Sequence, residues 1–300
     1  MTRLVIRPLV ADEGPLFESL PEAGLLGPAS PIHTYDVLVA AGEYRPEWTW
    51  VALREGAVVA RAAWRGGTGL DVPFVLDALD FTDFDAAVQL LRTAPLRTEY
   101  TLVLPPDWRD VPAVKEAADA RIAAATAAGL RFLVERHRYR WTPDHGLPPR
   151  PGRLEFRPES DDEVFLAAFR RVHEGTLDAH ARRATDESGL DAAAREDLDL
   201  MLGMPSPRSW WRLAFTGDGE LAGLSIPGRN QRDPIIGYIG VLPEQRGHGY
   251  AYDLLVEATH LLVAEGADRI AAATDTTNRP MAAAFARAGY PVTEHRIDFV

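Results

Sequence analysis

The chain has 300 residues, of which 46% are hydrophobic and 25% charged, and its formal net charge is −12. This composition is typical of a soluble globular protein, and the length suits two domains of about 150 residues each. No apolar run approaches the roughly 18 residues of a membrane span. An acidic surface disfavours contacts to nucleic-acid phosphates, and the absence of cysteine excludes disulfides and thiolate sites.

The N-terminal stretch MTRLVIRPL has neither the apolar region nor the cleavage site of a secretory signal, so we expect a cytoplasmic protein. Arginine is far more common than lysine and alanine is abundant, which suggests a GC-rich bacterial genome. The acidic surface mildly favours cationic partners such as amines. We expect no nucleic-acid or membrane partner, and both a monomer and a homodimer fit the sequence.

An internal repeat predicts how the chain is divided. RLVIRPLVADEGPLF begins at Arg3, and the similar RLEFRPESDDEVFLA begins at Arg153. Residues 127–141 and 287–299 are also similar, and a proline-rich stretch at 142–152 separates the two halves. The repeat therefore predicts tandem domains at 1–145 and 153–300, joined by a linker at 146–152.

The second half can be followed element by element. An alternating strand at 153–158 precedes a helix at 160–175, for which Ser160 is the predicted N-cap and Glu163 the capping-box residue. The later segments are a helix at 190–203, strands at 209–216, 220–227 and 234–242, a helix at 250–265, a strand at 269–274, a helix at 279–288 and a strand at 292–300. Early strands can join by hairpins and later ones need helical crossovers, which predicts an α/β fold with a mixed sheet.

A glycine turn lies in GVLPEQRGHGYAYDLL, residues 240–255, between a predicted strand and a predicted helix. Gly247 and Gly249 allow the backbone to curl, and the amides of the turn and of the first helical residues can hold an anion such as a pyrophosphate. The dinucleotide fingerprint fails because Tyr252 replaces its third glycine, and the phosphate-binding P-loop fails because it needs a lysine.

Two motifs make the second half resemble the GNAT superfamily, the GCN5-related N-acetyltransferases. The first is R-x-x-G-x-A, formed by Arg246, Gly249 and Ala251 after Val241-Leu242-Pro243. The second is NRPMAAAFARAGY at 278–290, which fits the family pattern at Asn278, Met281, Gly289 and Tyr290. The resemblance implies two tandem GNAT-like domains, of which the second is catalytic.

The family resemblance also implies acetyl-CoA as the co-substrate. The turn amides would hold its pyrophosphate, Asn278 would bond to its pantetheine arm, and Val241 would lie on the strand beside that arm. The residues expected to bind acetyl-CoA are Ile239, Val241, Arg246, Gly247, His248, Gly249, Tyr250, Ala251 and Asn278.

The first half departs from this pattern. Where its turn should follow 69–81, the sequence continues FTDFDAAVQLL, with no arginine or glycine, and Asp83 and Asp85 would repel a pyrophosphate. Its last predicted helix keeps Gly129 but has no clear counterpart of Asn278. We expect the first half to be a degenerate copy that keeps the fold, lacks acetyl-CoA and helps to shape the substrate cleft.

The catalytic residues are less clearly marked. Phe285 stands where the family usually has a tyrosine acid, so Tyr238 is the candidate acid, with Tyr250 and Tyr252 as alternatives, unless water protonates the thiolate. Asp233 is the candidate base. Glu174 and Asp178 are candidates for binding the amine, although a solvated helix end with caps is the simpler explanation for them. His173 and His180 do not have the spacing of a helical metal site, and we predict no metal.

The sequence therefore predicts an enzyme that transfers an acetyl group, or another acyl group, directly from its CoA thioester to a small-molecule primary amine. A non-catalytic acyl-CoA sensor or scaffold is the alternative that Phe285 leaves open. An enzyme acting on protein amines is a third possibility, and the identity of the acceptor stays open.

Overall fold

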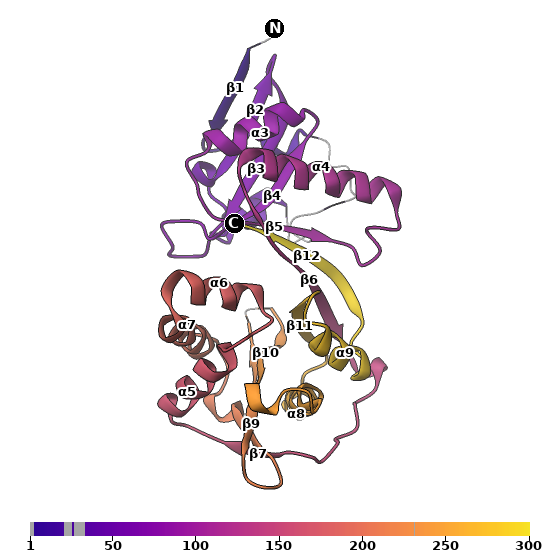
Figure 1. The fold of residues 1–300 in the computed structure, drawn as a ribbon. Helices are drawn as coiled ribbons and strands as arrows, with labels where there is room; N and C mark the ends of the chain where they lie inside the picture. The colour runs from indigo at the N-terminus through magenta and orange to yellow at the C-terminus, as the bar shows by residue number, and fades with distance from the viewer. Residues whose placement is uncertain (1–2, 21–25, 27–33, 231) are drawn as a thin grey trace. The chain divides into compact units, whose positions relative to one another are not determined.

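The computed structural model describes residues 3–20, 26, 34–230 and 232–300. The chain divides into two compact units: residues 1–135 with 294–300, and residues 136–293. Each unit is a mixed sheet with helices on both faces (Figure 1). The predicted mixed α/β fold is confirmed, and each unit can be described from its own strands and helices.

The described residues of the first unit form six strands in the order β1-β2-β3-β4-β5-β12, antiparallel except for β4 and β5. The strands are β1 (Leu4–Pro8), β2 (Thr49–Arg54), β3 (Ala57–Arg65), β4 (Val75–Phe81), β5 (Glu99–Leu104) and β12 (Val292–Phe299). Its helices are α1 (Gly14–Glu18), α2 (Tyr35–Ala40), α3 (Phe84–Thr93) and α4 (Pro112–Ala128). Apolar residues of α3 and α4 form one core with the sheet, and those of α1 and α2 form another.

The second unit repeats this plan in the order β7-β8-β9-β10-β11-β6. Its strands are β7 (Glu155–Pro158), β8 (Arg212–Phe215), β9 (Leu221–Arg229), β10 (Pro234–Val241), β11 (Ile270–Asp275) and β6 (Phe132–Trp141). Its helices are α5 (Asp162–His173), α6 (Ala179–Ser188), α7 (Leu190–Leu202), α8 (Tyr250–Ala264) and α9 (Arg279–Arg287). The α5–α7 group and the α8–α9 pair contribute to separate cores (Figure 1). The short 3₁₀ helices of this unit are η2 (Pro143–His145), η3 (Arg208–Trp210) and η4 (Pro243–Gln245), and the first unit contains η1 (Pro46–Trp48).

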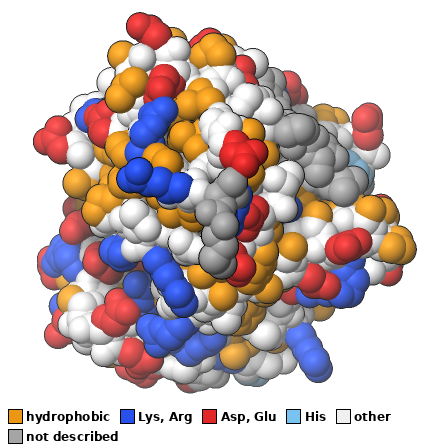
Figure 2. Space-filling view, turned by 90° about the horizontal axis from the view of Figure 1, so that it is seen from above, with side chains coloured by type: hydrophobic (Ala, Val, Ile, Leu, Met, Phe, Trp, Pro, Cys, Tyr) orange, Lys and Arg blue, Asp and Glu red, His pale blue; other side chains and the backbone are white. Residues whose placement is uncertain are grey.

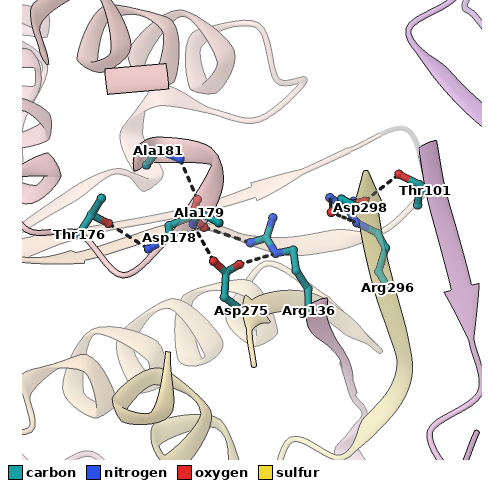
Figure 3. Close-up of polar contacts among 9 residues, drawn as sticks. All are labelled: Thr101, Arg136, Thr176, Asp178, Ala179, Ala181, Asp275, Arg296 and Asp298. Carbon is teal, nitrogen blue, oxygen red and sulfur yellow. Dashed lines mark hydrogen bonds and ion pairs between the residues drawn. The ribbon is translucent and has the colours of Figure 1, made fainter. Parts of the chain in front are cut away.

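The last strand of the first sequence half, β6, completes the sheet of the second unit. The last strand of the second half, β12, completes the sheet of the first unit. β6 pairs antiparallel with β11, from Trp141 opposite Ile270 to Arg136 opposite Asp275. β12 pairs antiparallel with β5, and Thr101 Oγ1 donates to Asp298 Oδ1 at 2.8 Å across that pair (Figure 3). The compact units therefore differ from the sequence division at 146–152, because residues 136–145 join the second unit and 294–300 join the first.

Two local predictions in the second half differ from the structure. The N-cap of α5 is Asp161, whose Oδ1 accepts the Glu163 amide at 2.9 Å, so the prediction of Ser160 was wrong. Glu163 makes an ion pair with Arg195 at 3.1 Å in place of the expected capping box. Helix α6 was not predicted, because its sequence AHARRATDES is mostly polar and buries only Ala179 and Ala181.

Acidic and basic side chains are interspersed with apolar ones on the face shown in Figure 2. The structure contains many such pairs at short range, for example Arg61–Asp80 at 3.0 Å and Arg136–Asp275 at 3.1 Å. Many acidic residues are therefore paired locally, and the net charge of −12 is carried by the acidic residues in excess of the basic ones. In the described part of the chain, no helix is long and apolar enough to cross a membrane, and no cluster of three acidic or histidine side chains could hold a metal ion.

Candidate functional site

A pocket of about 480 Å³ lies in the second unit where β10 and β11 separate. These parallel strands share the single register pair Ile235↔Ala271, and β10 then continues to Val241 without β11 beside it. The lining residues are Val172, Gly175, Thr176, Leu177, Ile239, Gly240, Val241, Gln245, Arg246, Gly247, Gly249, Tyr250, Ala251, Asn278, Pro280 and Met281. The separation of the strands therefore leaves a groove whose walls come from α5, the glycine turn and α9.

The backbone around Gly240 is tightly packed against α5 and β9. A Cβ at Gly240 would lie 2.7 Å from the methyl carbons of Val172, and one at Gly223 would lie 2.2 Å from the Gly240 carbonyl oxygen. The register of β9 and β10 shifts between Ile236 and Tyr238, which marks an irregularity at Gly237. Small residues are thus required where the strand passes under α5 and bends toward the pocket.

The glycine turn closes one end of the pocket. Gly247 has φ +86° and Gly249, the residue before α8, has φ +75°, conformations that strain any residue with a side chain. No hydrogen bond from the amides of 247–251 is found within the part of the chain that the structure describes. Successive free amides before a 15-residue helix present partial positive charge to an anion.

Arg153 fixes the carbonyl groups of the same turn. Its guanidinium donates to the His248 oxygen at 2.9 Å and to the Gly249 oxygen at 3.2 Å. It also makes an ion pair with Asp253, which is only 2% exposed. Sequence reasoning aligned Arg153 with Arg3 in the repeat but did not identify this role. Because the turn carbonyls are already occupied, its amides are the groups left for a ligand.

Arg153→Ala is expected to weaken acetyl-CoA binding about tenfold, because the ligand must then order the turn itself. The substitution also leaves the buried Asp253 carboxylate without its partner, and we expect a loss of stability of about 2 kcal/mol. Calorimetry and denaturant unfolding would measure the two effects. Arg150→Ala removes a more exposed arginine that pairs with Glu257 and serves as the control; equal effects in both variants would contradict the assigned role.

Arg246 was expected to bind acetyl-CoA, but its guanidinium contacts the backbone of the protein. It lines the pocket, but its guanidinium donates to the carbonyls of Val172 at 2.8 Å, Glu174 at 2.7 Å and Gly175 at 3.1 Å. A cation at the C-terminal end of α5 is favoured by the helix dipole. The arginine therefore ties α5 to the glycine turn and holds the pocket wall as well as placing positive charge beside it.

The other residues expected to bind acetyl-CoA also lie at this site, with one exception. Ile239, Val241, Tyr250, Ala251 and Asn278 line the pocket. Asn278 also caps α9, because its Oδ1 accepts the Met281 amide at 3.3 Å. The exception, His248, is outside the lining and stacks on Tyr250 with ring centroids 5.5 Å apart.

Residues 176–290 match the model of the Acetyltransferase (GNAT) family. The second half of this chain belongs to the GNAT family. The whole chain shares the fold of a GCN5-related N-acetyltransferase from Sphaerobacter thermophilus, with TM-score 0.55, 16% identity and coverage of 99% of this chain and 94% of that one. It also shares the fold of a tandem GNAT protein from the clavulanic acid biosynthesis pathway, with TM-score 0.50, 19% identity and coverage of 99% and 98%.

A third similar structure is the GCN5-related glucosamine N-acetyltransferase region of a fungal multi-domain GH3 β-N-acetylglucosaminidase. Its TM-score is 0.54 at 13% identity, and the match covers all of this chain but 38% of that one. No curated protein matches the chain by sequence. These similarities establish a tandem GNAT fold.

The two candidate catalytic residues occupy different parts of the GNAT domain. The Tyr238 ring packs edge-on against Phe169 at 4.7 Å, and burial followed by the charges of Asp197 and Asp178 raises the pKa of its hydroxyl. Tyr238 therefore stays protonated at neutral pH, as a proton donor must. Asp233 precedes β10, about 26 Å along the strand from Val241, and pairs with Arg269 at 2.5 Å. That position fits a structural ion pair, and we assign Asp233 no catalytic step.

The side chain of Phe285 is buried among aromatic rings. Phe285 is 1% exposed and stacks on Tyr139 of β6, with centroids 4.2 Å apart and an interplanar angle of 17°. Burial raises the pKa of Tyr139 to about 12. Tyr252, one of the two alternative acids, is also buried and lies under the Arg287 guanidinium at 3.9 Å. Phe285, Tyr139 and Tyr252 are outside the pocket lining, whereas Tyr250, the other alternative acid, is part of it.

The expected amine-binding residues lie at the end of α5 and the start of α6. Glu174 ends α5, and its carbonyl accepts from Arg246. Asp178 caps α6 by accepting the Ala181 amide at 3.0 Å, and its other oxygen lies 3.3 Å from Arg136. Arg136 also lies 3.1 Å from Asp275, whose Oδ2 accepts the Ala179 amide at 2.7 Å (Figure 3). Sequence reasoning identified Asp178 but not Asp275 or Arg136.

The first unit has the same strand divergence but no comparable pocket among its described residues. β4 and β5 pair only at Val75↔Glu99 and Leu76↔Tyr100, yet the cavity beside them has a volume of about 10 Å³. Arg121 fills this region by donating to the Leu79 oxygen at 2.9 Å and pairing with Asp80 at 2.6 Å. A buried ion pair thus occupies space that is open in the second unit.

The helix that follows this divergence is also closed to an anion. Asp83 caps α3 by accepting the Ala86 amide at 2.9 Å and pairs with Arg54 at 2.6 Å. The amide hydrogen bond, followed by Arg54, lowers the pKa of Asp83, so its carboxylate is ionised at neutral pH. A ligand phosphate would have to displace this carboxylate and overcome its charge.

Proposed function

We propose that the second half of the chain transfers an acetyl group from acetyl-CoA directly to a small-molecule primary amine. The observation that carries the proposal is the turn of free amides at 247–251, joined to a pocket of about 480 Å³. A pyrophosphate suits these amides, and the groove between β10 and β11 is open to an extended arm. The first half would be a degenerate copy that binds no acetyl-CoA.

Acetyl-CoA would supply the acetyl group as a thioester, and the residues of this chain would position it. The turn amides would hold the pyrophosphate, and Asn278 would bond to the pantetheine arm. Residues 239–241 of β10 continue past the point where β11 diverges, so their backbone can donate to the developing oxyanion. The amine must be neutral when it attacks, because an ammonium has no free electron pair.

A group other than the side chain of residue 285 would donate the proton to the leaving thiolate. Tyr238 keeps its proton at neutral pH and lies on β10, the strand that forms the pocket wall. Tyr250, which lines the pocket, and water entering the pocket are the other available donors. The same departure at Phe285 supports a second candidate function, a sensor that binds acyl-CoA without turning it over.

Release of CoA thiol in the presence of a panel of primary amines separates these two functions. The enzyme is expected to release thiol above the no-amine blank with at least one amine, and Gly249→Trp is expected to abolish that release. Acetyl-CoA binding without thiol release from any amine of the panel would favour the sensor.

A further inference from the structure

The pocket wall at Gly240 is closed on the side of α5. Val172 and Gly240 both line the pocket, and a Cβ placed on Gly240 would lie 2.7 Å from both methyl carbons of Val172 and 3.1 Å from the Tyr238 ring. Carbon atoms in favourable contact lie about 3.5–4.0 Å apart. No further carbon therefore fits between Val172 and Gly240, and the two residues form one continuous surface of the pocket.

The end of α5 that carries Val172 is held from two directions. The Arg246 guanidinium donates to the Val172 carbonyl at 2.8 Å, which ties this end of the helix to the residue before the glycine turn. The next residue, His173, is 4% exposed, and its Nε2 lies 2.8 Å from the Asp197 carboxylate of α7. The methyl groups of Val172 could move away from Gly240 only if these contacts were broken.

The acyl group of a bound CoA thioester would lie against this wall. With the pyrophosphate at the amides of 247–251, the groove between β10 and β11 would carry the pantetheine arm, and the backbone of 239–241 would donate to the thioester oxygen. The acyl chain would then start beside Gly240, the middle residue of that segment. Toward α5 the chain would meet the methyl groups of Val172, so the size of residue 172 would set how long the chain can be.

We propose that Val172, held against Gly240, restricts the acyl group of the CoA thioester to acetyl. The single methyl group of acetyl fits beside the wall, whereas the two further carbons of butyryl overlap the Val172 methyl groups. Forcing additional carbons into a well-packed site typically weakens binding about tenfold or more. This inference rests on the proposed function, because it assigns the acyl donor of that site.

Calorimetry with acetyl-CoA and butyryl-CoA, each titrated into the full chain, tests this assignment. The wild-type protein is expected to bind butyryl-CoA about tenfold more weakly than acetyl-CoA. Val172→Ala removes both methyl groups and should reduce this preference to about twofold. The preference of each variant is a ratio of two affinities, so a general weakening of the site, which acts on both ligands, cancels.

Two controls separate the size of the side chain from general disturbance. Val172→Thr keeps the branched shape and should keep the preference for acetyl-CoA. Val256→Ala removes the same two methyl groups from a buried valine of α8 outside the pocket lining and should also keep it. Equal binding of the two thioesters by the wild-type protein, an undiminished preference in Val172→Ala, or an equal loss in Val256→Ala would overturn the assignment of Val172 alone. Absent binding of acetyl-CoA would overturn the proposed function as well.

Discussion

Gly249→Trp is expected to abolish acetyl-CoA binding, weakening it at least about a hundredfold. Gly249 has φ +75°, which strains a residue with a side chain, and it lies directly before α8 in the pocket lining. A Cβ there would lie 3.8 Å from the Arg153 guanidinium that holds the turn. The indole would therefore disturb the turn and occupy the space of the anion. Calorimetry of acetyl-CoA with each variant would measure the effect.

Gly219→Trp is the matched control for this substitution. Gly219 lies in the turn between β8 and β9 of the second unit and has φ +83°. A Cβ at this position would have no described atom within 4 Å. The control therefore carries a similar conformational cost without touching the pocket. Normal binding by Gly219→Trp and lost binding by Gly249→Trp would separate a local effect from general destabilisation, whereas loss of binding in both variants would contradict the assignment of the turn.

Trp141→Ala is expected to destabilise the second unit by about 3–5 kcal/mol, although the residue belongs to the first half of the sequence. Trp141 is 1% exposed within the core formed by α8, α9 and β11. Its indole nitrogen donates to the Gly146 oxygen at 3.0 Å, and β6 pairs it with Ile270. Its loss would leave a cavity between β11 and the helices α8 and α9.

Hydrogen exchange resolved by segment would locate this effect. Amides of α8 and β11 should exchange faster in Trp141→Ala, while those of β2 and β3 should be unchanged. Trp108→Ala, in the core of the first unit, should produce the reverse pattern. Faster exchange confined to the first unit in Trp141→Ala would show that β6 does not belong to the second sheet.

The glycine turn could be predicted because its residues act locally. Gly247 and Gly249 adopt positive φ, and the strand and helix around them follow from short-range patterns. The prediction that the first half cannot hold a pyrophosphate also depended on local sequence. Asp83 interrupts the site by capping the helix just after it, an interaction within three residues.

The strand exchange and the ion pairs of Arg136 with Asp178 and Asp275 could not be predicted in this way. Residues 127–141 and 287–299 are similar in sequence, so either could complete either sheet. Arg136, Asp178 and Asp275 come from three distant segments, and the register of β6 beside β11 brings them together. Asp233 was chosen because it precedes β10, whereas the pocket lining on that strand begins at Ile239, near the strand's other end.

Hydrogen exchange with and without acetyl-CoA tests the central claim most directly. The amides of 247–251 should become strongly protected when acetyl-CoA is added, because they would donate to its pyrophosphate. The corresponding amides at 83–87 of the first unit should show no change. Protection at 83–87, or binding without protection at 247–251, would contradict the assignment of the glycine turn as the single acetyl-CoA site.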